Sequence, residues 1–311
     1  LQDEDTDHLT KEQLARALEI REFASNELKL PDNKSYLSYV ALDRPYVSWA
    51  VFAAPEFSLQ AKTWCFWIVG CIPYRGYFSE EKAEQFSQSL LKQGYEIYIA
   101  PIPAYSTLGW FDDPLLSSML DQGEVITANY IFHELAHQEI YIPDDSEFNE
   151  AFASAVAELG VVSWLYAQNN HQALENYLRR LEIREQVYTV TRSFRQELST
   201  IYAEDLTDRE KRKKKKLAFS EYKFNIRQLV NRLGGSPSYA KWVLSNTNNA
   251  KLSATSTYQE LIPAFKSFFK QCDENFEKYY QAVARMSLLT KAQRRKSLLM
   301  DECYIVSGEH S

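Results

Sequence analysis

The chain has 311 residues, of which 45% are hydrophobic and 14% aromatic, so it can bury a substantial core as one elaborated domain or two. This composition excludes a chain that is disordered overall. The formal net charge of −7 argues against a general nucleic-acid-binding protein. No apolar run approaches the roughly 18 residues that a membrane span needs, and no signal peptide is visible.

The first hundred residues alternate between helical and strand-like patterns. An amphipathic helix is predicted from about residue 8 to residue 28, before Pro31. Aromatic and β-branched residues then predict strands, with a helix near 79–93 before the last of them. The three strand-like runs are 36–52, 64–78 and 95–101. The fold class expected is therefore α+β, with a small antiparallel or mixed sheet.

The most informative segment of the sequence is His133-Glu134-Leu135-Ala136-His137. Residues four apart lie on one face of a helix, so both imidazoles can bind a single zinc ion at about 2.0–2.1 Å. Glu134 lies beside them and is placed to take a proton from a metal-bound water. The alternative is a chance pair of histidines that are solvated or that cap a neighbouring helix.

The residues around this motif predict its helix. Asp121 and Glu124 resemble a capping box, and Ile126, Tyr130 and Tyr141 continue the spacing of the two histidines. Pro143 stops the pattern. The sequence therefore predicts a helix with an apolar back, ending before residue 143.

A catalytic zinc usually has three protein ligands and one open position, so a third ligand is required. The next predicted helix, 147 to about 167, offers Glu147, Glu150 and Glu158. Because the connection before it is short, this helix should return antiparallel and face the histidines. Glu147 lies too near the turn, but helix geometry alone does not separate Glu150 from Glu158.

The rest of the chain reads as helical to about residue 233, with a break at Gly234-Gly235-Ser236-Pro237. Helices are predicted again near 237–245, 257–280 and 290–300. We expect two parts: a zincin-like catalytic core at 1–170 that contains the first helix and the sheet, and a helical subdomain at 171–311 that closes one side of the cleft.

Six consecutive basic residues occupy positions 211–216. They would suit an anionic surface, but they follow several acidic residues in a helix-compatible stretch. A solvated helix face or a mobile connection is the favoured interpretation.

Four cysteines allow two disulfides in three connectivities, of which the two local pairs are the simplest. The cysteines are Cys65, Cys71, Cys272 and Cys303. Four reduced thiols remain the alternative at this point. No Cys-x-x-Cys spacing or neighbouring histidine indicates a second metal site.

Two further segments are rich in groups that suit a cleft. The segment from Tyr105 to Pro114 could offer its backbone as an edge for an extended peptide, or could be an ordinary loop anchored by its aromatic residues. Residues 245–250 offer amides, and the phenol of Tyr258 follows soon after. A phenol near the zinc could donate to an oxyanion, whereas asparagine-rich segments are commonly turns or helix caps.

Several of these motifs together resemble the bacterial putative aminopeptidase family, and the resemblance covers most of the chain. The matching stretches are 30–56, 74–78, 105–114, 132–138, 148–150, 248–250 and 257–265. Asn149-Glu150-Ala151 is also similar to the Asn-Glu-Ala signature of gluzincin metallopeptidases, in which the glutamate binds zinc. The resemblance therefore implies one zinc ion per chain, held by His133, His137 and Glu150. Thermolysin-like members have a longer gap before this glutamate and an aspartate one turn later, where this chain has Ser154.

The resemblance implies a zinc metallopeptidase that removes N-terminal residues from peptides, with Glu134 as base and Tyr258 or Arg75 assisting at the oxyanion. The residues expected to bind substrate are Arg75, Tyr105, Gly109, Trp110, Asp112, Asn248 and Asn249. Asp112, Asp113 and Glu158 are the candidates for binding the substrate's ammonium group. The alternatives are an endopeptidase with the same mechanism, and a non-catalytic peptide-binding module that retains a structural metal.

The same resemblance implies an exported protein, either periplasmic or a membrane-anchored lipoprotein, and a disulfide between Cys65 and Cys71. A cytoplasmic protein is the alternative. The expected partner is a peptide substrate and not a nucleic acid. Membrane contact is expected only through a lipid anchor outside the given chain.

Overall fold

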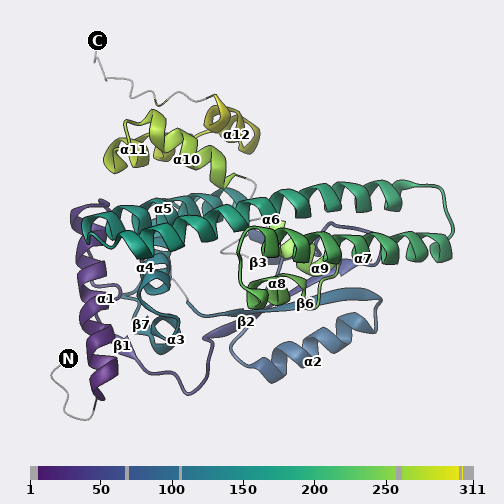
Figure 1. Cartoon of the computed structure of the whole chain (residues 1–311), viewed down its shortest axis with the longest axis horizontal. Coiled ribbons are helices and arrows are strands. Elements are labelled where there is room, and N and C mark those ends of the chain that lie inside the picture. Colours follow the sequence, from purple (N-terminus) through teal and green to yellow (C-terminus); the bar gives the residue numbers. More distant parts are fainter. Residues whose placement is uncertain (1–5, 67–69, 105–106, 257–260, 301–302, 304–311) are drawn as a thin grey trace. The chain divides into compact units, whose positions relative to one another are not determined.

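The computed structural model describes residues 6–66, 70–104, 107–256, 261–300 and 303 (Figure 1). The described residues form helices and small sheets, as expected for an α+β protein. The chain divides into two compact units. Unit 1 consists of residues 1–47, 102–169 and 260–311, and unit 2 consists of residues 48–101 and 170–259.

Unit 1 is built around two packed helices, α4 (Glu124–Glu139) and α5 (Ser146–Ala167), which lie side by side in Figure 1. Helix α1 (His8–Asn26) packs on α4, and α10 (Ile262–Gln271) packs on α5. Strands β1 (Tyr39–Val40) and β7 (Leu115–Leu116) form a short parallel pair before α3 (Ser117–Leu120). The remaining helices of the unit are α11 (Phe276–Met286) and α12 (Lys291–Leu299).

A glycine allows the close approach of α5 to its neighbours. A Cβ at Gly160 would lie 2.7 Å from the Leu28 side chain and 2.8 Å from the Phe132 ring, closer than side chains pack. Phe132 is fully buried on the apolar back of α4. The apolar back of the predicted amphipathic helix is therefore buried, with Phe132 packed against α5.

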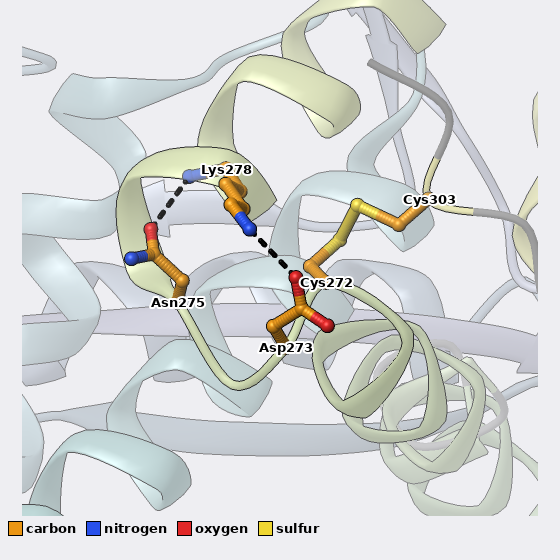
Figure 2. The surroundings of a disulfide bond; sticks show 5 residues. All are labelled: Cys272, Asp273, Asn275, Lys278 and Cys303. Atoms are coloured by element: carbon orange, nitrogen blue, oxygen red, sulfur yellow. Dashed lines mark hydrogen bonds and ion pairs between the residues drawn. A yellow bond between two sulfur atoms is a disulfide. The ribbon is translucent and has the colours of Figure 1, made fainter.

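The end of unit 1 is held by a disulfide between Cys272, at the end of α10, and Cys303. Figure 2 shows this bond beside the tight turn that leads into α11. In that turn the Asn275 side chain caps α11 by accepting the backbone N–H of Lys278 at 3.0 Å, and the Lys278 ammonium binds Asp273 at 2.6 Å. The local pairing of Cys272 with Cys303 is as the sequence suggested.

Unit 2 contains a three-stranded sheet in the order β5-β2-β6, formed by β5 (Arg75–Tyr77), β2 (Ser48–Pro55) and β6 (Tyr95–Ile102). Strands β2 and β5 pair antiparallel, with Trp49 opposite Tyr77. Helix α2 (Glu80–Leu91) packs against β2. A separate hairpin, β3 (Trp64–Phe66) and β4 (Gly70–Ile72), places Cys65 opposite Cys71, and the two form a disulfide.

A long helical hairpin forms the rest of unit 2 (Figure 1). Helix α6 (His171–Ala203) is followed by α7 (Asp208–Arg232), which begins with a capping box between Thr207 and Glu210. Phe194 and Tyr222 stack between the two helices at 4.3 Å between ring centroids. Two short helices, α8 (Pro237–Leu244) and α9 (Asn249–Ser256), complete the unit.

Several predicted boundaries change in the structure. The helix predicted at 257–280 is interrupted at Cys272–Asn275, between α10 and α11. The predicted capping box of Asp121 and Glu124 is wrong, because α4 begins after Gly123, whose φ of 87° favours glycine, and has no side-chain cap. Helix α4 also ends at Glu139, four residues before Pro143.

The two compact units interleave along the sequence. The predicted division into a catalytic core at 1–170 and a helical subdomain at 171–311 stays a prediction. The predicted role of the later helices in closing a cleft stays a prediction. Among the described residues, no helix combines the length and apolar character that crossing a bilayer requires.

Candidate metal centre

Helix α4 places His133 and His137 one turn apart, as their spacing predicts. Their Nε2 atoms lie 3.1 Å apart, and the two rings are nearly perpendicular. His137 is buried and His133 is partly buried. Two imidazole nitrogens therefore face the same point in space.

The helix that follows brings a carboxylate to this point. Glu150 Oε2 lies 3.4 Å from His133 Nε2, and Glu150 Oε1 lies 3.5 Å from His137 Nε2. Burial raises the pKa of Glu150, but the nearby imidazoles outweigh burial and hold this pKa well below its usual value. Glu150 therefore faces the histidines as a carboxylate.

The three groups fit a zinc ion by their chemistry and spacing. Their ligand atoms all lie within 4.8 Å of one another, and two nitrogens with one carboxylate oxygen are typical zinc ligands. Three ligands would leave one coordination position open, as catalytic zinc sites do. One feature departs from well-ordered zinc sites: His137 Nδ1 is buried without a hydrogen-bond partner among the described residues, whereas a ligating histidine usually donates its second N–H.

The turn between α4 and α5 is held by the residue before Glu150. The buried side chain of Asn149 accepts the backbone N–H of Ile142 at 2.9 Å and donates to its carbonyl at 2.7 Å. Both hydrogen-bonding groups of one backbone residue are thus satisfied by one amide. Asn149 therefore sets how α5 leaves the turn, and with it the direction of Glu150.

The first turn of α5 is also held by α12. Arg294 donates to Asp145 Oδ2 from Nε at 3.0 Å and from Nη2 at 2.8 Å, and both side chains are buried. Lys291 lies 3.3 Å from the other oxygen of Asp145. Arg295 pairs with Glu147, so Glu147 is engaged away from the histidines. Glu150, the third potential ligand, is therefore carried on a helix whose first turn is held by Arg294, Lys291 and Arg295.

Glu134 lies on α4 between the two histidines and has an unusual electrostatic environment. Burial raises its pKa to about 7; the interaction with His133 opposes this rise, while Glu150 and Asp113 add to it. A carboxylate with a pKa near the working pH can both accept and return a proton. The general-base role predicted for Glu134 stays a prediction.

Asp113 belongs to a compact loop next to α4. Its buried carboxylate accepts the backbone N–H and the hydroxyl of Thr107 at 2.8 and 3.0 Å, which closes the loop. Gly109, at a positive φ of 81°, lies against the Gln138 side chain, because a Cβ there would be 3.8 Å from it. Trp110 is 81% exposed at the tip of this loop.

The other predicted site residues lie in different places. Asp112 is exposed, and Glu158 is buried and bound by Lys266 at 3.0 Å. Arg75, Asn248 and Asn249 belong to unit 2. The predictions for Tyr105 and Tyr258 fall outside the described residues. Substrate binding by any of these residues stays a prediction.

The asparagines of unit 2 have structural partners. Asn248 donates to the Ile97 carbonyl at 2.8 Å and caps the N–H of Lys251. Asn249 is fully buried and donates to the carbonyls of Pro55 and Glu56. These contacts tie α9 to the sheet.

Sequence reasoning did not single out the two phenols beside the centre. Burial raises the pKa of Tyr141, and the Glu150 charge adds to this rise. Burial is also the main cause of the raised pKa of Tyr130, one turn before His133, to which the Glu134 charge contributes less. The spacing that predicted the helix placed Tyr130 on the face of the histidines, whereas Tyr141 lies beyond the end of α4.

A comparison with protein families found one match: a family model described as "Putative aminopeptidase" matches residues 1–298. No curated protein and no solved structure matched the chain.

Proposed function

The chain belongs to the putative aminopeptidase family, and we propose that it is a zinc-dependent peptidase that removes residues from the amino termini of peptides. The single observation that carries the zinc proposal is the convergence of His133, His137 and Glu150. The preference for amino termini is supported by the family description alone.

A zinc ion held by these three residues would supply Lewis acidity and lower the pKa of a water at its open position. Glu134 is the residue of this chain that moves the proton. As a carboxylate it accepts the proton of the attacking water, and as a carboxylic acid it returns a proton to the leaving amine.

The centre favours catalysis over a purely structural metal. A structural zinc usually has four protein ligands, whereas only three converge among the residues that the structure describes. A structural site also needs no carboxylate like Glu134 beside it.

We further propose that the protein works in an oxidising compartment. Both pairs, Cys65–Cys71 and Cys272–Cys303, form disulfides, and such bonds are rare in the reducing cytosol.

The test is hydrolysis of aminoacyl reporter amides and of N-terminally blocked peptides by protein whose zinc content has been measured. Glu134→Gln is compared with Glu139→Gln, a matched control on the same helix. We expect Glu134→Gln to keep about one zinc per chain and to lose activity by at least about a hundredfold, since general bases contribute roughly 10²–10⁴. Glu139→Gln should stay active.

The outcomes separate the alternatives. Cleavage of free amino termini alone supports the aminopeptidase, and cleavage of blocked peptides would make it an endopeptidase. Zinc binding without turnover of either set would favour the non-catalytic binding module. Failure of the wild-type chain to bind zinc would reject the metal proposal itself.

A further inference from the structure

The basic run at 211–216 divides into two sets in helix α7. Four of its six residues have structural partners: Lys211 binds the Tyr202 carbonyl, Arg212 binds Glu56, Lys214 binds Glu204, and Lys215 binds Glu96 and the Glu56 carbonyl. Lys213 and Lys216 are exposed and have no ionic partner within the described part of the chain. Four residues of the run therefore have contacts that can stabilise unit 2, whereas Lys213 and Lys216 remain available for another role.

The two remaining lysines belong to a longer stripe on α7. At 3.6 residues per turn they share an arc of about 120° with other outward-facing residues, opposite the buried positions of the helix. We name this set the α7 stripe: Arg209, Lys213, Lys216, Leu217, Ser220, Lys223, Phe224 and Arg227. Its five cations have no ionic partner among the described residues, and the acidic residues of α7 fall outside the arc.

The stripe also carries two large apolar side chains that are not covered. Leu217 is 70% exposed and Phe224 is 60% exposed. They are separated by seven residues, two helical turns, so they point the same way about 10 Å apart. The buried side of the same helix is occupied by residues such as Tyr222 and Ile226, so the exposed pair is not needed for the core.

We propose that the α7 stripe binds the surface of an anionic lipid bilayer, with its cations at the headgroups and Leu217 and Phe224 entering the interface. This is peripheral contact by a helix that lies along the surface. The stripe is basic although the whole chain has a net charge of −7, so attraction is confined to this face.

The apolar pair favours a bilayer over a soluble polyanion. A nucleic acid or an acidic polysaccharide would be attracted by the cations but would leave Leu217 and Phe224 in water. A bilayer interface accepts both kinds of side chain, and lysine stems contribute apolar contact there. Because only two apolar residues contribute, binding should be weak and sensitive to salt.

The test is sedimentation of the full chain with vesicles of phosphatidylcholine, with or without phosphatidylglycerol at about one third of the lipid. We compare Lys213→Gln/Lys216→Gln and Leu217→Gln/Phe224→Gln with the charge-matched control Lys241→Gln/Lys270→Gln. The control lysines are exposed on α8 and α10. Each lysine near an anionic membrane increases the partition coefficient about fivefold, so Lys213→Gln/Lys216→Gln should bind the anionic vesicles at least about tenfold more weakly than the wild-type protein.

The expected result is binding to the anionic vesicles only, weakened by salt and by both stripe variants but not by the control. Absence of binding to anionic vesicles would overturn the proposal. So would equal weakening by the control variant, because binding would then depend on overall charge. Binding to heparin without dependence on Leu217 and Phe224, and without vesicle binding, would assign the stripe to a soluble polyanion. None of these outcomes depends on the proposed peptidase activity.

Discussion

Asp145 and Arg294 form a buried ion pair across 149 residues of sequence, with two nitrogens of the guanidinium donating to one carboxylate oxygen. Arg294 also donates to the Leu289 carbonyl and lies over the Phe148 ring. The pair joins α12 to the start of the helix that carries Glu150. Helix α12 thus helps to position Glu150 through its contact with the start of α5.

Replacing Arg294 by methionine should destabilise the protein by roughly 3–5 kcal/mol, because it leaves the buried Asp145 carboxylate without its main partner. Zinc affinity should fall as well, since the first turn of α5 loses its anchor. Thermal denaturation and zinc titration measure the two effects. The control is Val283→Ala, which removes buried volume from α11 at a cost of roughly 2 kcal/mol but leaves the contacts of α5 with α12 intact. If Arg294→Met were as stable as the wild-type protein, the prediction would be refuted.

Replacing Asn149 by alanine should weaken zinc binding about tenfold without removing a ligand. The change leaves the N–H of Ile142 unsatisfied and leaves its carbonyl with the Asp145 N–H alone, at a cost of about 1–3 kcal/mol in unfolding free energy. Competition with a zinc indicator measures the affinity. The control is Asn170→Ala, which removes the exposed cap of α6, should cost about 1 kcal/mol, and should leave zinc affinity unchanged. Equal zinc affinity in the two variants would contradict the positioning role.

The two disulfides should contribute unequally to stability. Cys272 and Cys303 are 31 residues apart, and Cys65 and Cys71 are 6 apart. Loop entropy predicts about 3–4 kcal/mol for the longer loop and about 2 kcal/mol for the shorter one. Denaturant unfolding of Cys272→Ser/Cys303→Ser and Cys65→Ser/Cys71→Ser tests this order, and the reverse order would show that chain entropy does not dominate.

Lys251 should make stability rise at alkaline pH. Its ammonium is buried, donates to the carbonyls of Trp242 and Ser245, and has a pKa lowered by burial to about 8. Between about pH 8 and 10.5 the unfolded lysine binds more protons than the folded one, so the free energy of unfolding increases with pH. The gain over Lys251→Met should be on the order of 3 kcal/mol at most across this window.

Denaturant unfolding at pH 7.5 and at pH 10.5 measures the difference, because these values lie about half a unit below and about two and a half units above the shifted pKa of about 8. Lys251→Met lacks the titrating ammonium group, so its pH profile reports the effects of alkaline pH on all other groups and is the reference for the wild-type protein. Parallel pH profiles of the two proteins would show that Lys251 has an ordinary pKa in the folded state.

Local patterns were sufficient for much of unit 1. The spacing of His133 and His137 predicted the helix and its metal-facing side, because side chains four apart are held together by the backbone alone. The start of the next helix was predicted to within one residue. The two disulfides join the cysteines that are nearest in sequence, which was the simplest of the three connectivities. The boundaries that failed, at residues 121–124 and 272–275, depend on the φ of Gly123 and on a tight turn, which periodicity does not report.

The spacing of residues within one segment was enough to identify the metal-facing helix, because the helix face is set within a few turns of the backbone. Helix geometry did not separate Glu150 from Glu158; the family resemblance favoured Glu150, and the tertiary structure places Glu150 at the histidines and Glu158 beside Lys266. The tertiary structure alone decided that Arg294 binds Asp145, that Arg212 and Lys215 bind Glu56 and Glu96, and that Lys213 and Lys216 have no ionic partner among the described residues. The three ion pairs join residues more than a hundred positions apart, and a one-dimensional pattern contains no measure of that proximity.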